Sequence, residues 1–218
     1  MTLIPTKRFS GLAAIYGSVI YFIMSHISIL FYAGGTPWDK TKSGYHYWEN
    51  FLSDLGETVA KNGEPNLSSM ILMNSSIIIF GLSLIIFYLN YSSFTNIKWI
   101  GLMAAGFGVF SSIGLIMVGG APSNTLKAIH LFGVYMWALG LLIAIILTLC
   151  SNNHIMPKWL TVFSSILMVL LAYHMYQGIT NVRGLPITIV QKIVFNLNVF
   201  WYMAMGWVLT NKKSLSLD

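Results

Sequence analysis

Charged residues are scarce in this chain of 218 residues. Asp, Glu, Lys and Arg together make up 8% of it, whereas a soluble domain carries about 25%. So few charges cannot cover a surface that faces water, which excludes an ordinary soluble domain. Hydrophobic residues make up 56% of the chain, and runs of about 20 apolar residues are what cross a bilayer. The composition therefore predicts an all-α integral membrane protein.

Cysteine and acidic residues are also few. A single cysteine excludes an internal disulfide and a cluster of thiolate metal ligands. Six acidic residues stand against twelve Lys and Arg, for a formal net charge of +6. In a polytopic membrane protein such an excess indicates topology and contact with lipid head groups, and we expect no nucleic-acid partner. Because phosphate loops, dinucleotide fingerprints and zincin motifs are missing as well, no motif names a reaction.

Six long apolar segments are present. We expect one transmembrane domain over 1–218, a six-helix bundle with spans at about 9–33, 67–91, 97–119, 126–150, 158–177 and 187–210. Each segment is near the length needed to cross ~30 Å of hydrocarbon at 1.5 Å per residue. The first segment is too long for the apolar region of a signal peptide, so we expect it to be an anchor.

The basic residues divide equally between the two sides of the membrane. Those that directly flank helices at the chain ends, Lys7 with Arg8 and Lys212 with Lys213, carry most weight in the positive-inside rule. We therefore expect a multi-pass protein of the cell membrane with both termini in the cytoplasm. Lys192 lies inside the last span, where it either snorkels to the head groups or faces a polar chamber.

The longest connection, residues 34–66, has a pattern of its own. Apolar residues recur at 45, 48, 52 and 55, which is helical spacing. We predict a short interfacial helix over Tyr45–Leu55 that lies across the mouth of the bundle. Asp54 would then sit in the last turn, where the helix dipole disfavours an anion. Such a carboxylate needs a cation, a metal or a hydrogen-bond donor beside it.

Ionisable residues gather on one side of the membrane. The connections between spans one and two, three and four, and five and six share that side, and they hold every acidic residue except Asp218. His130 and His174 lie at span edges on the same side, where ionisable groups are costly and mark functional sites. We expect Asp54, His130 and His174 to meet in a polar chamber at the non-cytoplasmic mouth, with Arg183 nearby.

Small residues mark the third span. Gly101 with Ala105 and Ala104 with Gly108 form small-xxx-small pairs, which let helices approach closely. We predict that this span is the most buried helix of the bundle.

Several short motifs resemble a known family. They are Ser53-Asp54-Leu55-Gly56 before the second span, Asn74-Ser75-Ser76 within it, Val118-Gly119-Gly120-Ala121-Pro122 after the third, and His130 at the start of the fourth. This set resembles the prokaryotic, largely archaeal, six-span membrane family known as domain of unknown function 998. The first motif is also similar to one in the six-span autophagy-modulator family. Neither resemblance implies an established activity.

A weaker likeness connects the chain to the alkaline ceramidase and adiponectin-receptor-like hydrolases. That likeness implies Ser, Asp and His residues around a zinc ion within a seven-span bundle. This chain has six expected spans, and its last span lacks the His-x-x-x-His pair of those enzymes.

Two interpretations of function remain open. The first is a membrane hydrolase or transferase that acts on a lipid, with Asp54 as base or metal ligand and His130 and His174 as acid–base groups or ligands. Its substrate-binding residues would be Ser53, Asn74, Lys127 and Arg183. The second is a non-enzymatic lipid-binding protein, sensor, transporter or assembly subunit. The absence of an internal repeat and of proline within the spans argues against transport.

The histidines leave the cofactor open. Zinc needs three or four N, O or S ligands, which His130, His174 and Asp54 would supply, with His46 or His26 as a fourth. A b-type haem needs two axial histidines on facing helices. Because no span carries two stacked histidines, we do not expect haem. Membrane lipids are the expected partners.

Overall fold

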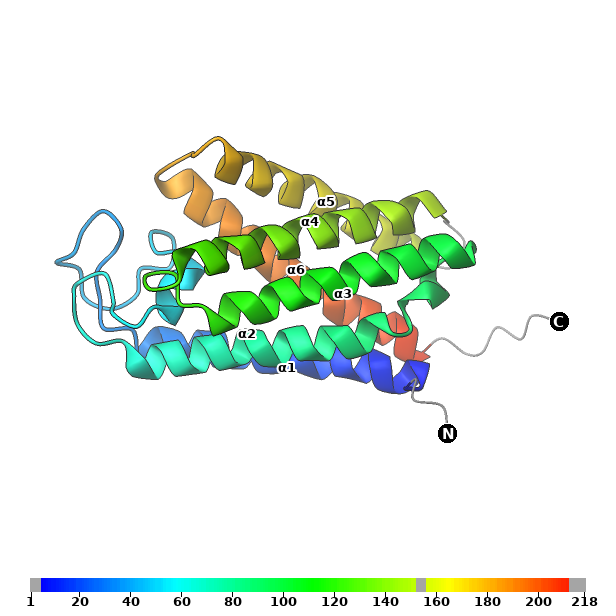
Figure 1. Ribbon diagram of the computed structural model, residues 1–218, viewed down its shortest axis with the longest axis horizontal. Helices are drawn as coiled ribbons and strands as arrows, with labels where there is room; N and C mark the ends of the chain where they lie inside the picture. Colours follow the sequence, from blue (N-terminus) through cyan, green and yellow to red (C-terminus); the bar gives the residue numbers. More distant parts are fainter. Residues whose placement is uncertain (1–4, 152–155, 212–218) are drawn as a thin grey trace.

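The computed structural model describes residues 5–151 and 156–211. Six long helices form most of this part of the chain (Figure 1). They are α1 (Lys7–Leu30), α2 (Leu67–Tyr88), α3 (Lys98–Gly120), α4 (Lys127–Ser151), α5 (Lys158–Ile179) and α6 (Leu185–Asn211). Two short 3-10 helices, η1 (Leu52–Gly56) and η2 (Tyr91–Phe94), lie in connections. All six long helices are long and apolar enough to cross a membrane. The predicted segments differ from them by three residues at most, and Lys212 and Lys213 lie outside the described residues.

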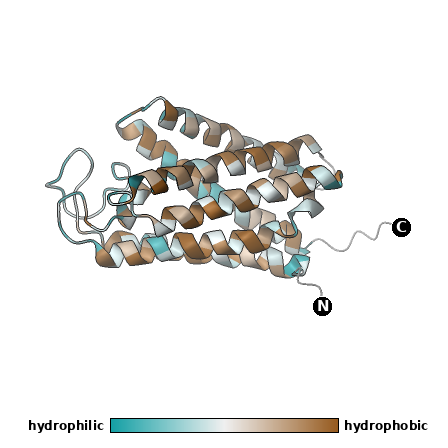
Figure 2. Ribbon diagram, viewed as in Figure 1, coloured by the Kyte–Doolittle hydropathy of each residue, from teal (hydrophilic) through white to brown (hydrophobic). Residues whose placement is uncertain are grey.

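Successive helices run in opposite directions. The start of α1 and the end of α6 therefore lie at the same end of the bundle (Figure 1). The opposite end is covered by residues 31–66, which we call the cap. Figure 2 shows hydrophilic residues gathered in the cap, while the helices are largely hydrophobic. Helices α1 to α4 pack each on the next, α6 packs on α1, and α5 packs on α4 and α6.

The prediction that the third span is the most buried helix is wrong. Helix α6 buries a larger share of its residues than α3. Two of the glycines of α3 lie on its packed side: Gly108 faces the ring of Tyr88 in α2, and Gly114 faces the backbone of Gly133 in α4. On its other side Leu102 and Phe110 are exposed. Small residues therefore permit close contact with two neighbouring helices, while the opposite side of α3 stays exposed.

The predicted helix over Tyr45–Leu55 is also wrong, because only η1 forms there, after a turn. Two side chains take up backbone donors. Asn50 Oδ1 accepts from the backbone N–H of His46 at 3.0 Å, and Asp54 Oδ2 accepts from the backbone N–H of Phe51 at 2.9 Å. Such local bonds compete with helix formation. Asp54 therefore lies in the first turn of a helical segment, where free N–H groups favour a carboxylate.

Candidate functional site

A buried ionic cluster holds the cap together. Lys61 Nζ lies 3.2 Å from Asp54 Oδ1 and 2.6 Å from Glu57 Oε1. The two carboxylate side chains are only 3% and 6% exposed. Ser123, in the connection between α3 and α4, donates a hydrogen bond to Glu57 Oε1 at 2.9 Å. The cation that the sequence required beside Asp54 is therefore Lys61, a residue of the same loop.

Burial and charge act in opposite directions on the pKa values of this cluster. Burial raises the pKa of Glu57 above its ordinary value, and the hydrogen bond from Lys61 offsets only part of that rise. Burial lowers the pKa of Lys61, but the attraction of Asp54 and Glu57 is larger in sum, so its pKa is raised. The lysine therefore stays charged between two carboxyl groups, and Glu57 takes up a proton more readily than an exposed glutamate.

Lys192 joins α6 to the cap. Its side chain is buried, and Nζ donates hydrogen bonds to the main-chain carbonyl oxygens of Asn50 and, at 3.4 Å, Thr188. The rings of Tyr45 and Tyr47 lie with their centroids 5.9 and 5.5 Å from the same ammonium group, within the range of a cation–π interaction. The side chain therefore does not snorkel outward to the bundle surface.

Further hydrogen bonds fix η1 against the helices beneath it. Asn74 Nδ2 in α2 donates to the carbonyl oxygen of Gly56 at 3.1 Å. Gln191 Oε1 in α6 accepts from the N–H of Leu52 at 2.9 Å. A side chain at position 56 would collide with the amide of Asn74, so glycine permits this close approach. These bonds make η1 the roof of the space below.

A pocket lies under η1, between the helices. Its cavity volume is about 50 Å³. One water molecule needs about 10–15 Å³ on this measure, so the cavity has room for a few water-sized groups. Apolar and aromatic side chains form most of its wall, among them Tyr21, Met73, Ile77, Leu115, Val134 and Phe195. Its polar lining consists of Ser53, Asn74, His130, Trp137, His174 and Gln191.

His130 has a defined tautomer when neutral. Its Nδ1 lies 2.8 Å from the main-chain carbonyl oxygen of Ala121. A carbonyl oxygen only accepts, so Nδ1 carries the proton and Nε2 keeps a free lone pair. The pocket wall therefore includes a ring nitrogen that can accept a hydrogen bond.

Two other polar atoms of the pocket residues are buried without a hydrogen-bond partner in the described part of the chain. They are Trp137 Nε1 and His174 Nδ1. The amide of Gln177 lies near His174 but does not reach hydrogen-bonding geometry. Unpaired buried donors are rare, because each costs free energy. Trp137 is 4% exposed, and neighbouring atoms close its Nε1 off from the cavity.

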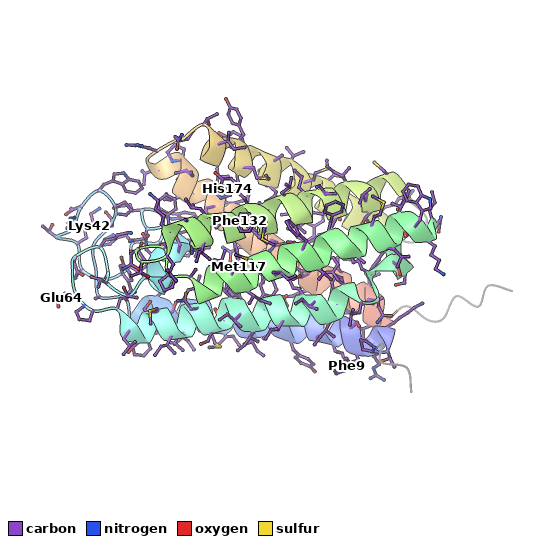
Figure 3. All side chains as sticks on the ribbon, in the orientation of Figure 1. Phe9, Lys42, Glu64, Met117, Phe132 and His174 are labelled. Atoms are coloured by element: carbon purple, nitrogen blue, oxygen red, sulfur yellow. The ribbon has the colours of Figure 1, made fainter. Side chains whose placement is uncertain are left out.

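The structure brings together only part of the predicted site. His130 and His174 line the same pocket as Ser53 and Asn74, and Figure 3 shows His174 on α5 toward the cap end. Asp54 does not line the pocket, since its carboxylate belongs to the cluster with Lys61.

The metal and anion sites predicted from the sequence are not assembled. Within residues 5–151 and 156–211, no three His, Cys, Asp or Glu side chains lie close enough to hold a metal. The ligand set Asp54, His130 and His174 is therefore corrected: the hydrogen bonds of the cap hold Asp54 away from the pocket. Lys127 and Arg183 are exposed and do not line the pocket, so neither is an anion clamp there.

Trp137 and Lys61 are the important residues that the sequence did not single out. A tryptophan within an apolar span has the pattern of a packing residue, and only the missing partner of Nε1 distinguishes it. The sequence holds one weak indication of an ion pair at Lys61, because this lysine follows Glu57 by four residues.

Comparisons of the chain with protein-family models, with curated proteins and with solved structures found no match. The resemblance to the six-span families therefore stays a prediction.

Proposed function

We propose that the chain is an integral membrane protein that binds the head of a membrane lipid in the pocket under its cap. Exposed apolar side chains such as Ile23, Leu82 and Val162 on three different helices support the membrane location, because a soluble surface seldom carries contiguous apolar area on this scale. The pocket lies at the end of the bundle where lipid head groups would begin.

Charge pairing supports cytoplasmic termini. At the cap end Lys42 pairs with Glu49 at 2.6 Å, and Lys61 pairs with two carboxylates. At the other end Lys7, Arg8 and Lys98 are exposed, and no described acidic residue lies there to pair with them. Lys127 and Arg183 at the cap end are exposed beside helix ends as well. The support for cytoplasmic termini is therefore the larger number of helix-flanking basic residues at the other end, where Lys158 joins these three.

The observation that carries the lipid-binding proposal is the apolar pocket under the cap, whose wall includes a few uncharged polar side chains. Ligand pockets combine apolar walls with a few polar groups that fix orientation. The polar side chains of the wall would contact the lipid head, and the acyl chains would leave through the open side. The enzymatic alternative has less support, because Asp54 is engaged by Lys61, Asn50 and the backbone.

Photo-crosslinking tests the proposal. The protein is reconstituted in nanodiscs with a lipid that carries a diazirine near its head group, and crosslinked peptides are mapped by mass spectrometry. We expect crosslinks to pocket residues, and we expect Val134→Trp to suppress them by filling the pocket. Val162→Trp, on the exposed side of α5, is the matched control. Equal labelling of the pocket in both variants, with both still monodisperse, contradicts the proposal.

Thiol labelling tests the orientation. Cys150 is exposed near the end of α4 that lies with the chain termini, whereas Lys40 is exposed in the cap. In intact cells a membrane-impermeant maleimide should label a Lys40→Cys, Cys150→Ser variant and should leave wild-type Cys150 unlabelled until the membrane is opened. The reverse pattern would place the cap in the cytoplasm.

A further inference from the structure

Basic residues stand without counter-charges at the end of the bundle where α1, α3 and α5 begin. Lys7 and Arg8 lie at the start of α1, Lys98 at the start of α3 and Lys158 at the start of α5, and all are exposed. Within residues 5–151 and 156–211, every acidic residue lies in the cap, at the opposite end. None of these basic side chains forms an ion pair in that described part of the chain. This end of the bundle therefore carries unbalanced positive charge.

An exposed aromatic side chain directly follows the basic residue at each of these three helix starts. The aromatic residues are Phe9, Trp99 and Trp159, which are 56%, 61% and 49% exposed. Trp207, about one turn before the end of α6, is exposed at the same end. Tryptophan rings that flank membrane spans lie at the depth of the lipid head groups. The surface therefore offers charge and apolar area side by side, which matches a lipid, whereas an acidic protein or a nucleic acid would need only the charge.

The start of α1 is fixed beside the connection that leads to α3. Asn90 Nδ2 donates to the carbonyl oxygen of Pro5 at 2.8 Å and to Ser10 Oγ at 2.9 Å. These two acceptor residues lie on either side of the basic pair of α1 in the chain. The 3-10 helix η2 follows Asn90 directly and packs on α3. The basic residues of α1 and α3 therefore belong to neighbouring parts of one surface.

We infer that this surface, which we call the basic end and which comprises Lys7, Arg8, Lys98 and Lys158, binds the head groups of anionic phospholipids. The inference rests on the membrane location in the proposed function but not on the pocket, which lies at the opposite end of the bundle. A zwitterionic phospholipid carries its own cation beside the phosphate, whereas an anionic phospholipid leaves the phosphate charge for the protein to balance. Each basic residue near the membrane surface favours anionic lipid by roughly fivefold.

Two crosslinking lipids with identical acyl chains test this inference in nanodiscs. They are a phosphatidylglycerol and a phosphatidylcholine, each with a diazirine close to the ester group. We expect the phosphatidylglycerol probe to label the starts of α1, α3 and α5 roughly fivefold more, or better, than the phosphatidylcholine probe. Salt at about 1 M should remove most of this preference, because it screens charges that are more than about 3 Å apart.

Glutamine variants test which residues form the surface. Lys98→Gln and Lys158→Gln should each lower labelling by the phosphatidylglycerol probe about fivefold near the altered helix start, while labelling by the phosphatidylcholine probe stays unchanged. Lys127 is also exposed at a helix start, but it shares its end of the bundle with the acidic residues of the cap. Lys127→Gln is therefore the matched control and should leave labelling of the basic end unchanged.

The outcomes separate this inference from the proposed function. Equal labelling of the basic end by the two probes in the wild-type protein overturns the inference. If soluble polyglutamate then binds the protein and Lys98→Gln weakens that binding, the surface serves an acidic protein instead. A preference that persists in both glutamine variants, or that falls equally in the Lys127 variant, overturns the role of the basic end. Failure of the proposed function appears elsewhere, as labelling of the pocket that Val134→Trp does not suppress.

Discussion

The ammonium group of Lys192 in α6 donates a hydrogen bond to the main-chain carbonyl oxygen of Asn50 in the cap, 142 residues earlier in the chain. Asn50 in turn donates from Nδ2 to Asp54 Oδ2 at 3.0 Å, and Asp54 pairs with Lys61. One continuous set of polar contacts therefore runs from the last helix into the ionic cluster of the cap. Because η1 roofs the pocket, this set also determines where the pocket ends.

We expect Lys192→Met to loosen the cap. Methionine fills a similar volume but leaves the carbonyl group of Asn50 without a donor, which costs about 1–3 kcal/mol. Thermal unfolding in detergent should show a lower midpoint, and hydrogen exchange should become faster in the cap. Lys127→Met, at an exposed position, is the control and should change neither. Unaltered exchange in the Lys192 variant would mean that the other bonds suffice.

Gly108→Ala should destabilise the bundle. An added Cβ at this position would collide with the ring of Tyr88, whose hydroxyl group is hydrogen-bonded to that of Tyr202 at 2.8 Å. The ring cannot move away without breaking this bond, and overpacking costs about 1–3 kcal/mol. Gly106→Ala is the matched control on the same helix, because a Cβ there meets nothing within 4 Å. Equal unfolding midpoints for both variants would contradict the packing described.

Glu57 should make the stability depend on pH in the acidic range. Burial raises its pKa above the ordinary value of 4.5, and Lys61 offsets only part of this. The folded protein then binds more protons than the unfolded chain, so this group's contribution to the free energy of unfolding falls as the pH rises from about 4.5 through the folded pKa. Above that pKa the contribution is lost.

Glu57→Gln should therefore flatten the change in unfolding midpoint between about pH 4 and pH 8 relative to wild type. Glu64→Gln, at an exposed position of the cap, should leave the wild-type slope intact. A wild-type slope in the Glu57 variant would show that other groups cause the pH dependence.

Two tryptophans should differ in what they contribute to stability. Trp201 Nε1 donates to Ser164 Oγ at 2.8 Å, whereas Trp137 Nε1 has no partner. In delipidated protein, Trp201→Phe should lower the free energy of unfolding by about 1 kcal/mol more than Trp137→Phe, because only the former loses a hydrogen bond. A larger loss for Trp137→Phe in delipidated protein would contradict the assignment of its donor as free.

The sequence by itself determined the six helices and which residues share an end of the bundle. An apolar run of about 20 residues has to satisfy its backbone groups internally, so its helical state depends on local composition alone. The alternation of helix direction then assigns every second connection to the same end. Asp54, His130, His174 and Arg183 were grouped at that end on this basis, and of these four His130 and His174 line the pocket.

Only the tertiary structure decided which polar groups are partners. Asp54 was expected beside two histidines, yet it pairs with Lys61 of its own loop, because side-chain bonds to the backbone at Asn50 and Asp54 replace a regular helix with a turn and η1. Lys192 turns inward because its ammonium group donates to the carbonyl oxygen of Asn50, 142 residues earlier in the chain. Such partnerships depend on the rotation of each helix about its axis and on the path of the cap, which the periodicity of one segment does not specify.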